Sequence, residues 1–207
     1  MLYAFGFERV SVLVSDLYFI DPEPLKGQES AERGVRLEVR MLDRGELKGS
    51  IYSAQPIGIG RPAWRADLLE SVDSPPGSLD RAHHHPSFAG WEPGHRVFDA
   101  ALSADPVRWV GEQLAGLEGL LRRSGIDRDE PPAGDGSSAG DGSSAGDGSS
   151  ADDRSLARDA ESVRGCLPEI MAAVERLLGQ VKAGELATAP GAGPGSAPLI
   201  SARVGWL

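Results

Sequence analysis

The chain has 207 residues, enough for one ordinary domain with additional segments, and its composition is that of a soluble globular protein. Its 21 Lys and Arg and 31 Asp and Glu give a formal charge of -10, which argues against non-specific nucleic-acid binding but leaves a local basic site open. A single cysteine, Cys166, excludes an internal disulfide and a cysteine-rich zinc site, and the cytoplasm is the expected compartment. No apolar run reaches the roughly 18 residues that span a bilayer, and the first residues do not look like a secretory signal, so no membrane partner is expected.

The first part of the chain is rich in strand-forming residues. Residues 3–20 predict one long strand or a pair of strands, and residues 21–30 predict a loop. A turn over 43–49 then leads to a further strand over 50–54. Residues 58–63 match the G-x-G-x-x-A pattern of dinucleotide-binding proteins, but no strand-helix-strand unit surrounds them, so a turn is expected there.

Apolar and charged residues alternate from Val35 to Met41. This alternation is typical of a strand with one buried face and one face in contact with water. Arg36 and Arg40 belong to the charged face, where they form either a substrate-facing patch or an ordinary solvated surface.

The stretch from Trp64 to Asp99 contains all four histidines and a concentration of acidic and basic residues, so any chemistry is expected here. Residues 64–69 predict a strand, residues 71–78 with their Pro-Pro-Gly predict a reversal, and residues 79–85 predict an antiparallel return. A helix that begins at Pro62 is the alternative for the first of these segments.

Strand geometry would bring three of these side chains together. Side chains alternate between faces along a strand, so His83 and His85 share one face and His84 lies on the other. With the turn centred near Pro76, Asp67 lies opposite His85 and one diagonal step from His83. A slip of one residue would place His84 beside Asp67 instead.

A helix is expected to close this region. Asp105 can cap it, Pro106 suits its first turn, and Gly125 can end it. Its apolar residues recur at helical spacing and predict a stripe that packs on the sheet: Val110, Leu114, Leu117 and Leu121. A small antiparallel β-sheet packed by a helix is an α+β fold, and residues 1–128 are expected to form this domain.

The rest of the chain divides into two segments. Residues 129–153 include GDGSSA three times in tandem and predict a flexible linker, either natural or introduced. Residues 154–207 predict a helix over 154–183, split or kinked at Pro168, and then the apolar tail LISARVGWL. One amphipathic helix is not stable alone, so it must dock on residues 1–128 or on a partner. The linker also allows this helix to fold back over the histidines as a lid or built-in inhibitor.

The order R-x-D, turn, D-R-x-H-x-H, G-x-E-P-x-x-R-x-F and closing helix resembles the small TumE-like toxins of bacterial toxin-antitoxin pairs. The resemblance covers residues 64–121, and the matching residues are Arg65, Asp67, Arg81, His83, His85, Glu92, Arg96 and Phe98. It implies a short β-sheet that carries the aspartate, and a nucleic-acid-directed enzyme that a partner protein neutralises.

The first functional hypothesis is a His-dependent nuclease-like toxin or another phosphodiester-acting enzyme. One of His83 and His85 would be the general base and the other the general acid, and Arg81 or Arg96 would hold the phosphate. Nucleic acid is then the substrate, although the net charge does not favour it.

Two alternatives remain open. A divalent metal such as zinc or manganese could be held by His83, His85 and Asp67, with Glu92 as a further ligand. The protein could also be a non-catalytic interaction or regulatory module, in which the histidines only satisfy backbone groups or a structural metal. Its tethered helix and tail would then contact a partner, either an antitoxin-like protein or a second copy of the chain.

Overall fold

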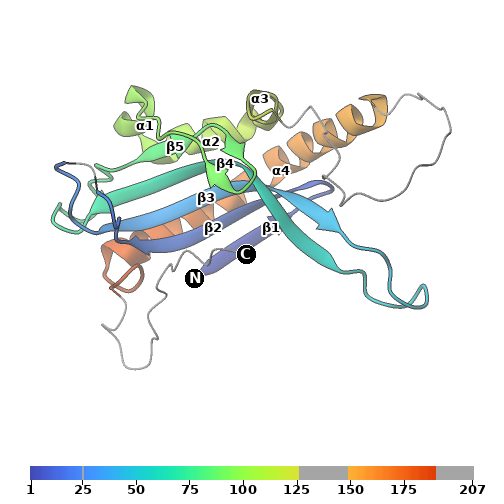
Figure 1. Ribbon diagram of the computed structural model, residues 1–207, viewed down its shortest axis with the longest axis horizontal. Helices are drawn as coiled ribbons and strands as arrows, with labels where there is room; N and C mark the ends of the chain where they lie inside the picture. Colours follow the sequence, from blue (N-terminus) through green and yellow to red (C-terminus); the bar gives the residue numbers. More distant parts are fainter. Residues whose placement is uncertain (25, 126–148, 190–207) are drawn as a thin grey trace.

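The computed structural model describes residues 1–24, 26–125 and 149–189, and only the backbone of residues 149–153. The chain has an α+β fold in which helices pack on one face of a five-stranded antiparallel sheet (Figure 1). The strands lie in the sheet in chain order: β1 (Leu2–Gly6), β2 (Val10–Phe19), β3 (Glu32–Arg44), β4 (Ile57–Ser71) and β5 (His83–His85). The predicted fold class and the predicted pair of strands within residues 3–20 are confirmed.

Alternation along the strands separates two faces of the sheet. Val14 lies opposite Leu37, and Leu37 lies opposite Ala66, so apolar residues of three strands meet on one face. The apolar face is fully buried at Val10, Val12, Val14, Val35, Leu37, Val39, Ala66 and Leu68. Burying a large aliphatic side chain contributes about 1.5–3 kcal/mol, so this face fixes which way each strand is turned. The intervening residues are therefore directed to the other face.

The described part of the chain contains four helices: α1 (Ala100–Ala104), α2 (Pro106–Ala115), α3 (Leu117–Arg123) and α4 (Ser149–Lys182). The Asp105 carboxylate caps α2 by accepting from Arg108 N at 3.1 Å, as its place before Pro106 predicts. The single helix predicted after Asp105 is wrong in one respect, because it is broken at Gly116 into α2 and α3. Glycine is a poor helix former, which accounts for a break at this position.

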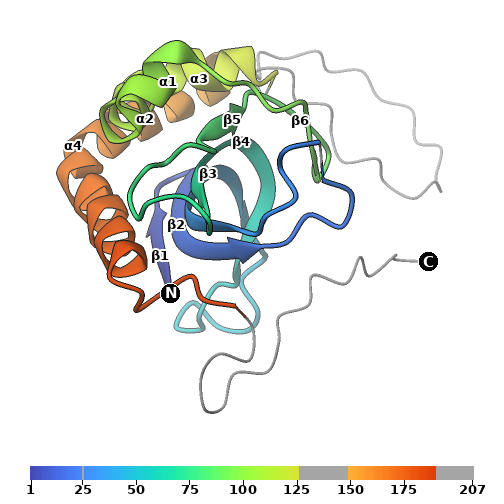
Figure 2. The same ribbon diagram turned by 90° about the vertical axis from the view of Figure 1, so that its left-hand side faces the viewer.

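The long helix α4 packs against the apolar face of the sheet together with α2 and α3. Figure 2 shows a strongly curved sheet with the helices along its outer, convex side. The buried residues of α4 recur at helical spacing, namely Val163, Ile170, Val174 and Leu177, each with no exposed surface. The prediction that the helix must dock is confirmed, and it continues through Pro168 without being split.

A second contact fixes α4 to the start of the sheet. The Asp159 carboxylate is 1% exposed and accepts hydrogen bonds from Glu8 N and Arg9 N at 2.7 Å and from Val10 N at 3.1 Å. Two of these N–H groups belong to the turn between β1 and β2, and the third belongs to Val10, the first residue of β2. A carboxylate that accepts several backbone N–H groups is a strong anchor, because each hydrogen bond is assisted by the charge.

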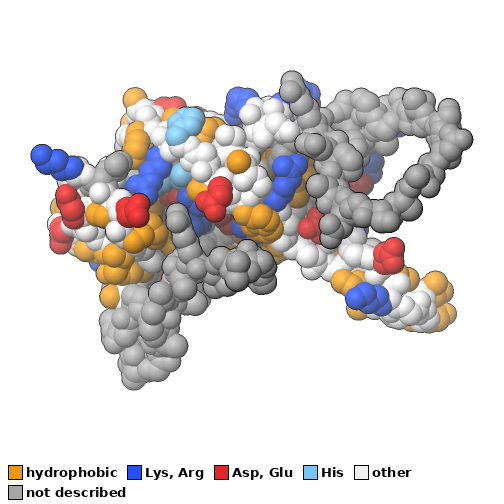
Figure 3. Space-filling view, viewed as in Figure 1, with side chains coloured by type: hydrophobic (Ala, Val, Ile, Leu, Met, Phe, Trp, Pro, Cys, Tyr) orange, Lys and Arg blue, Asp and Glu red, His pale blue; other side chains and the backbone are white. Residues whose placement is uncertain are grey.

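The β3–β4 hairpin extends beyond the rest of the sheet as an arm (Figure 1). Hydrophobic side chains are exposed along it, at Leu47, Ile51, Tyr52, Ile57 and Ile59, and Figure 3 shows hydrophobic side chains on the surface of this arm. The strand predicted over 50–54 is wrong, because Ser53 N donates to Ser50 O in a turn. The turn predicted over 58–63 is also wrong: these residues belong to β4, where a register shift beside Arg40 accommodates Pro62.

The predicted linker over residues 129–153 lies outside the described residues, except that residues 149–153 begin α4. The apolar tail predicted at the end of residues 154–207 also lies outside them. Among the described residues, no helix is both long enough and apolar enough to cross a membrane.

Candidate functional site

The face of the sheet opposite the helices is polar, and it carries the predicted histidines. In the register of the sheet, Arg36 lies opposite Asp67, Asp67 opposite His83, and Arg65 opposite His85. These five residues, Arg36, Arg65, Asp67, His83 and His85, are called the Asp67 cluster below. The prediction that both histidines share the face of Asp67 is confirmed.

The predicted register itself is wrong by two residues. Asp67 lies opposite His83, not His85, so the reversal is centred at Pro75 and not at Pro76. Moving the centre of a hairpin by one residue moves every partner by two, which leaves each side chain on the same face. The error therefore changes which histidine is nearest to Asp67 but not the composition of the cluster.

Asp67 is the centre of the cluster and is only 1% exposed. Arg36 Nε lies 2.7 Å from Asp67 Oδ1, and Arg65 Nε lies 2.9 Å from Asp67 Oδ2. Burial alone would raise the pKa of Asp67, but Arg36, the hydrogen bond of His83 and Arg65 outweigh it and hold this pKa well below its usual value. Asp67 is therefore ionised in the folded protein at any ordinary pH.

Both imidazole rings are oriented by backbone carbonyls. His83 Nδ1 donates to Arg81 O at 2.8 Å, and His85 Nδ1 donates to Gly94 O at 2.7 Å. A carbonyl can only accept, so Nδ1 carries a proton in each ring and Nε2 is the atom directed into the cluster. His83 Nε2 and His85 Nε2 lie 3.4 and 3.7 Å from Asp67 Oδ2.

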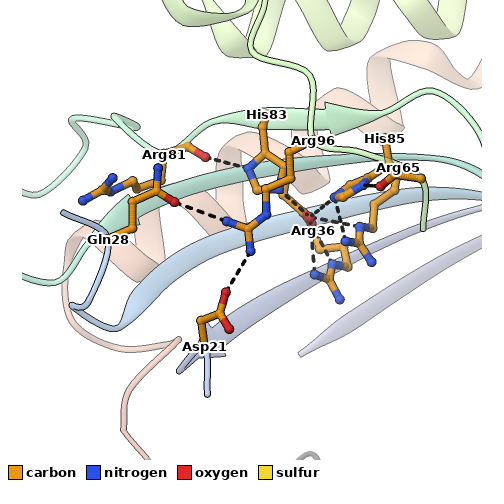
Figure 4. Close-up of polar contacts among 10 residues, drawn as sticks. Asp21, Gln28, Arg36, Arg65, Arg81, His83, His85 and Arg96 are labelled. Carbon is orange, nitrogen blue, oxygen red and sulfur yellow. Dashed lines mark hydrogen bonds and ion pairs between the residues drawn. The ribbon is translucent and has the colours of Figure 1, made fainter. Parts of the chain in front are cut away.

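The two histidines differ in their second partner. His85 Nε2 accepts a hydrogen bond from Arg65 Nη2 at 2.9 Å, whereas His83 Nε2 faces only the carboxylate among the contacts described. Burial and the charge of Arg65 lower the pKa of His85 to about 4, so its ring is neutral at pH 7. Figure 4 shows His83, His85, Arg36 and Arg65 converging on one point between the strands.

A divalent metal fits the cluster in one respect and conflicts with it in another. The ligand atoms of Asp67, His83 and His85 all lie within 4.8 Å of one another, and tetrahedral zinc ligands are about 3.4 Å apart. Hydrogen bonds from Nδ1 to carbonyls are also the usual outer partners of metal-binding histidines. However, the guanidinium of Arg65 contacts both Asp67 Oδ2 and His85 Nε2, so it already supplies a positive charge where the metal would lie.

Residues 86–98, called the cap segment below, contact the cluster through Gly94 O, Phe88 and Phe98, and the β2–β3 loop contacts this segment. The cap segment contains the short hairpin of β6 (Phe88–Ala89) and β7 (Glu92–Pro93). Arg96 of the cap segment donates to Gln28 Oε1 at 3.5 Å and to Asp21 Oδ2 at 3.4 Å in the loop (Figure 4). Both hydrogen bonds are long and therefore weak, so this connection between the two segments can open at little cost.

The remaining predicted site residues are distributed around the cluster. Arg81 orients His83 through its carbonyl, and its side chain donates to Gly27 O at 2.9 Å. Glu92 is exposed in β7 and lies outside the group of possible metal ligands. Its predicted place in the site is therefore not observed. His84 lies on the helix-facing side of β5, with its ring centroid 4.9 Å from that of Trp109.

Glu32 is a site residue that the sequence analysis missed. It lies on the polar face, is 5% exposed, and its Oε2 has no hydrogen-bond partner. Burial raises the pKa of its carboxyl, against the opposing charges of Arg96 and His83. The signal was present in the sequence, because Glu32 stands four residues before Arg36 on the same strand and therefore on the same face.

The structure contradicts the hypothesis that the helix over 154–183 is a lid over the histidines. The helix α4 packs on the apolar face of β2 and β3, whereas the Asp67 cluster lies on the opposite face. The helix cannot cover both faces at once.

Comparison with protein-family models, curated proteins and solved structures finds no match to this chain. The resemblance to TumE-like toxins therefore stays a prediction, and function has to be argued from the geometry of the cluster.

Proposed function

We propose that the Asp67 cluster is the active site of a small phosphodiester-acting, nuclease-like enzyme. The observation that carries this proposal is the convergence of two imidazoles and two guanidiniums on one buried carboxylate. Imidazoles supply the proton transfers of phosphodiester cleavage, and guanidiniums stabilise the negative charge that develops on the phosphate.

The roles of the two histidines follow from their surroundings. His85 is neutral at pH 7, so it is suited to accept the proton of the attacking hydroxyl or water. His83 can return a proton to the leaving oxygen from Nε2 when its ring carries a proton on both nitrogens, a form that the facing Asp67 carboxylate stabilises, and it then keeps the Nδ1 proton that Arg81 O accepts. For His85 to act as the base, Arg65 must move its hydrogen bond from His85 Nε2 to a phosphate oxygen of the substrate. This movement frees His85 Nε2 and places the positive charge of Arg65 beside the phosphate.

Arg96 is the further candidate for holding the phosphate. It belongs to the cap segment, and its hydrogen bonds to Gln28 and Asp21 are long enough to be exchanged for a phosphate. Arg81 is less suited, because its side chain already donates to Gly27 O at 2.9 Å.

A second function is favoured by the burial of the cluster. Asp67, His83 and His85 are each 1–3% exposed, and each has partners within the protein. A non-catalytic interaction or regulatory module would use such a network only to stabilise the sheet. Its contacts with a protein partner, antitoxin-like or a second copy, would then lie elsewhere on the chain.

The test compares histidine variants in the full chain. His83→Gln and His85→Gln should abolish cleavage of single-stranded RNA and of a chromogenic phosphodiester, while circular dichroism shows an intact fold. His95→Gln is the matched control, because His95 is exposed in the cap segment. Full activity of both cluster variants, or no activity in the unmodified protein, would reject the enzyme and leave the interaction module.

Metal content is measured on the same proteins. One equivalent of zinc or manganese that is lost in His83→Gln would assign the cluster as a metal site. Growth arrest on expression, relieved by His83→Gln, would support a cytoplasmic toxin, and co-purification of a second protein with the full chain would support an antitoxin-like partner.

A further inference from the structure

The cap segment places three aromatic rings around the Asp67 cluster. The guanidinium of Arg65 lies 5.9 Å from the Phe88 ring centroid, and the His83 ring centroid lies 5.5 Å from that of Phe98. The guanidinium of Arg40, on the polar face of β3, lies 5.2 Å from the Trp91 ring centroid. Each ring thus lies against a charged or titratable side chain of the sheet.

Two of these rings are largely in contact with water. Trp91 is 62% exposed and Phe98 is 52% exposed, although large aromatic side chains are normally buried for most of their surface. A ring that contacts a guanidinium and keeps more than half of its surface exposed is held in place and still able to stack with a ligand. Trp91 has this arrangement.

The Trp91 ring lies beside the cluster and not above it. Arg40 is two residues beyond Glu38 on β3, and Glu38 lies opposite Arg65 in the sheet. Two residues along a strand correspond to about 7 Å, so Arg40 and its Trp91 ring are one short step from the row that holds Arg65 and His85. One nucleotide can span this distance, with its base on the Trp91 ring and its phosphate at the guanidinium of Arg65.

We propose that Trp91 is a stacking platform for an unpaired base, and that the substrate of the cluster is single-stranded nucleic acid. This inference rests on the proposed function and names its substrate class. Stacking on an aromatic ring requires an exposed base, which a duplex does not offer, and it tolerates any base. It also supplies binding energy without a basic surface, which reconciles a nucleic-acid substrate with a formal charge of -10.

The charges around Trp91 predict how strongly binding depends on salt. Arg40 is 3.1 Å from Glu38, Arg65 is paired with Asp67, and Arg96 is paired with Asp21, while the neighbouring Glu92 is exposed. Phosphates would therefore be neutralised only by the few arginines that exchange their present partner for a phosphate, as proposed for Arg65 and Arg96. Binding should depend only weakly on salt, with a slope of log affinity against log salt of about -2 or shallower.

The experiment measures binding of a fluorescein-labelled RNA octamer to the full chain carrying His83→Gln, which prevents cleavage. Adding Trp91→Ala should weaken binding by about ten-fold or more, and Trp91→Phe should restore most of it. Tyr52→Ala is the matched control, because Tyr52 is 91% exposed on the distant arm and should leave binding unchanged. The same sequence as a duplex should bind at least about ten-fold more weakly, and single-stranded DNA tests whether the 2′-hydroxyl contributes.

Unchanged binding after Trp91→Ala, equal binding of duplex and single strand, or no binding at all would overturn the platform. If a small phosphodiester is still cleaved in a His83-dependent manner, only this inference fails. If RNA binds through Trp91 but His83→Gln and His85→Gln keep full activity, the proposed active site fails and the platform stands.

Discussion

Replacing Asp67 with asparagine tests whether the carboxylate charge organises the polar face. Asp67 Oδ1 accepts from Arg36, and Asp67 Oδ2 is contacted by both Arg36 and Arg65. An asparagine has the same shape, but one of its two terminal atoms is an NH₂ donor. Whichever way the amide is turned, this donor faces a guanidinium that also can only donate.

The expected loss is about 3 kcal/mol of unfolding free energy. Removing one partner of a buried ion pair typically destabilises a protein by about 3–5 kcal/mol. The lower end applies because the side chains of Arg36 and Arg65 are 26% and 14% exposed, so water can solvate part of the charge that is left.

Urea unfolding provides the measurement. Trp64 and Trp109 are buried and stacked with ring centroids 6.1 Å apart, so tryptophan fluorescence reports on the core between sheet and helices. With a slope of about 2 kcal/mol per molar urea, Asp67→Asn should lower the midpoint by about 1.5 M. Glu92→Gln removes the same charge at an exposed position and should change the midpoint little. A change below about 0.5 kcal/mol for Asp67→Asn would refute the account of the cluster as charge-balanced around Asp67.

Three further predictions follow from other contacts. The folded-state pKa of His85, about 4, lies below the ordinary 6.5, so the unfolded chain binds a proton more readily than the folded protein. The free energy of unfolding is therefore unaffected by His85 above pH 6.5 and decreases by up to about 3 kcal/mol as the pH falls towards 4. Urea unfolding between pH 7.5 and 5 should show this slope, and a slope unchanged in His85→Gln would contradict it. Asp159→Ala should destabilise by about 3 kcal/mol, because the buried Val10 N–H loses its acceptor, and a melting temperature within 1 °C or so of the unmodified protein would argue against the anchor. Pro168→Ala should stabilise by about 1–3 kcal/mol, because it allows the missing backbone hydrogen bond of α4; a lower urea midpoint would show that Pro168 is needed for the docked shape of the helix.

Period-two patterns predicted the strand around Arg36 and the faces of the site, but not the β3–β4 arm, where the strand predicted over 50–54 and the turn predicted over 58–63 are both wrong. The alternation around Arg36 and the spacing of His83 and His85 both depend only on backbone geometry, so they survived an error in the position of the turn. The same reasoning would have placed Glu32 on the polar face had it been extended to the start of β3.

Other features depend on contacts between distant segments and could not be derived locally. Ile51 and Tyr52 have strong strand propensity, yet they form the exposed end of an arm because no second layer covers them. Alternation along β4 places Arg65 on the same face as Asp67, but its contact with His85 arises only because β4 and β5 bring the three side chains together. Pro168 breaks the helical pattern locally, but packing of α4 on the sheet outweighs that preference.

The attachment of α4 through Asp159 has a consequence for synthesis of the chain. The ribosome finishes β4 about 110 residues before it finishes α4, so at 5–20 residues per second the sheet waits roughly 5–20 s for the helix that covers its hydrophobic side. A nascent chain stopped within this interval would present a long unprotected surface to chaperones and to other nascent chains. Expression of fragments that end before α4 is thus expected to give inclusion bodies, and mapping of the site should use the complete chain.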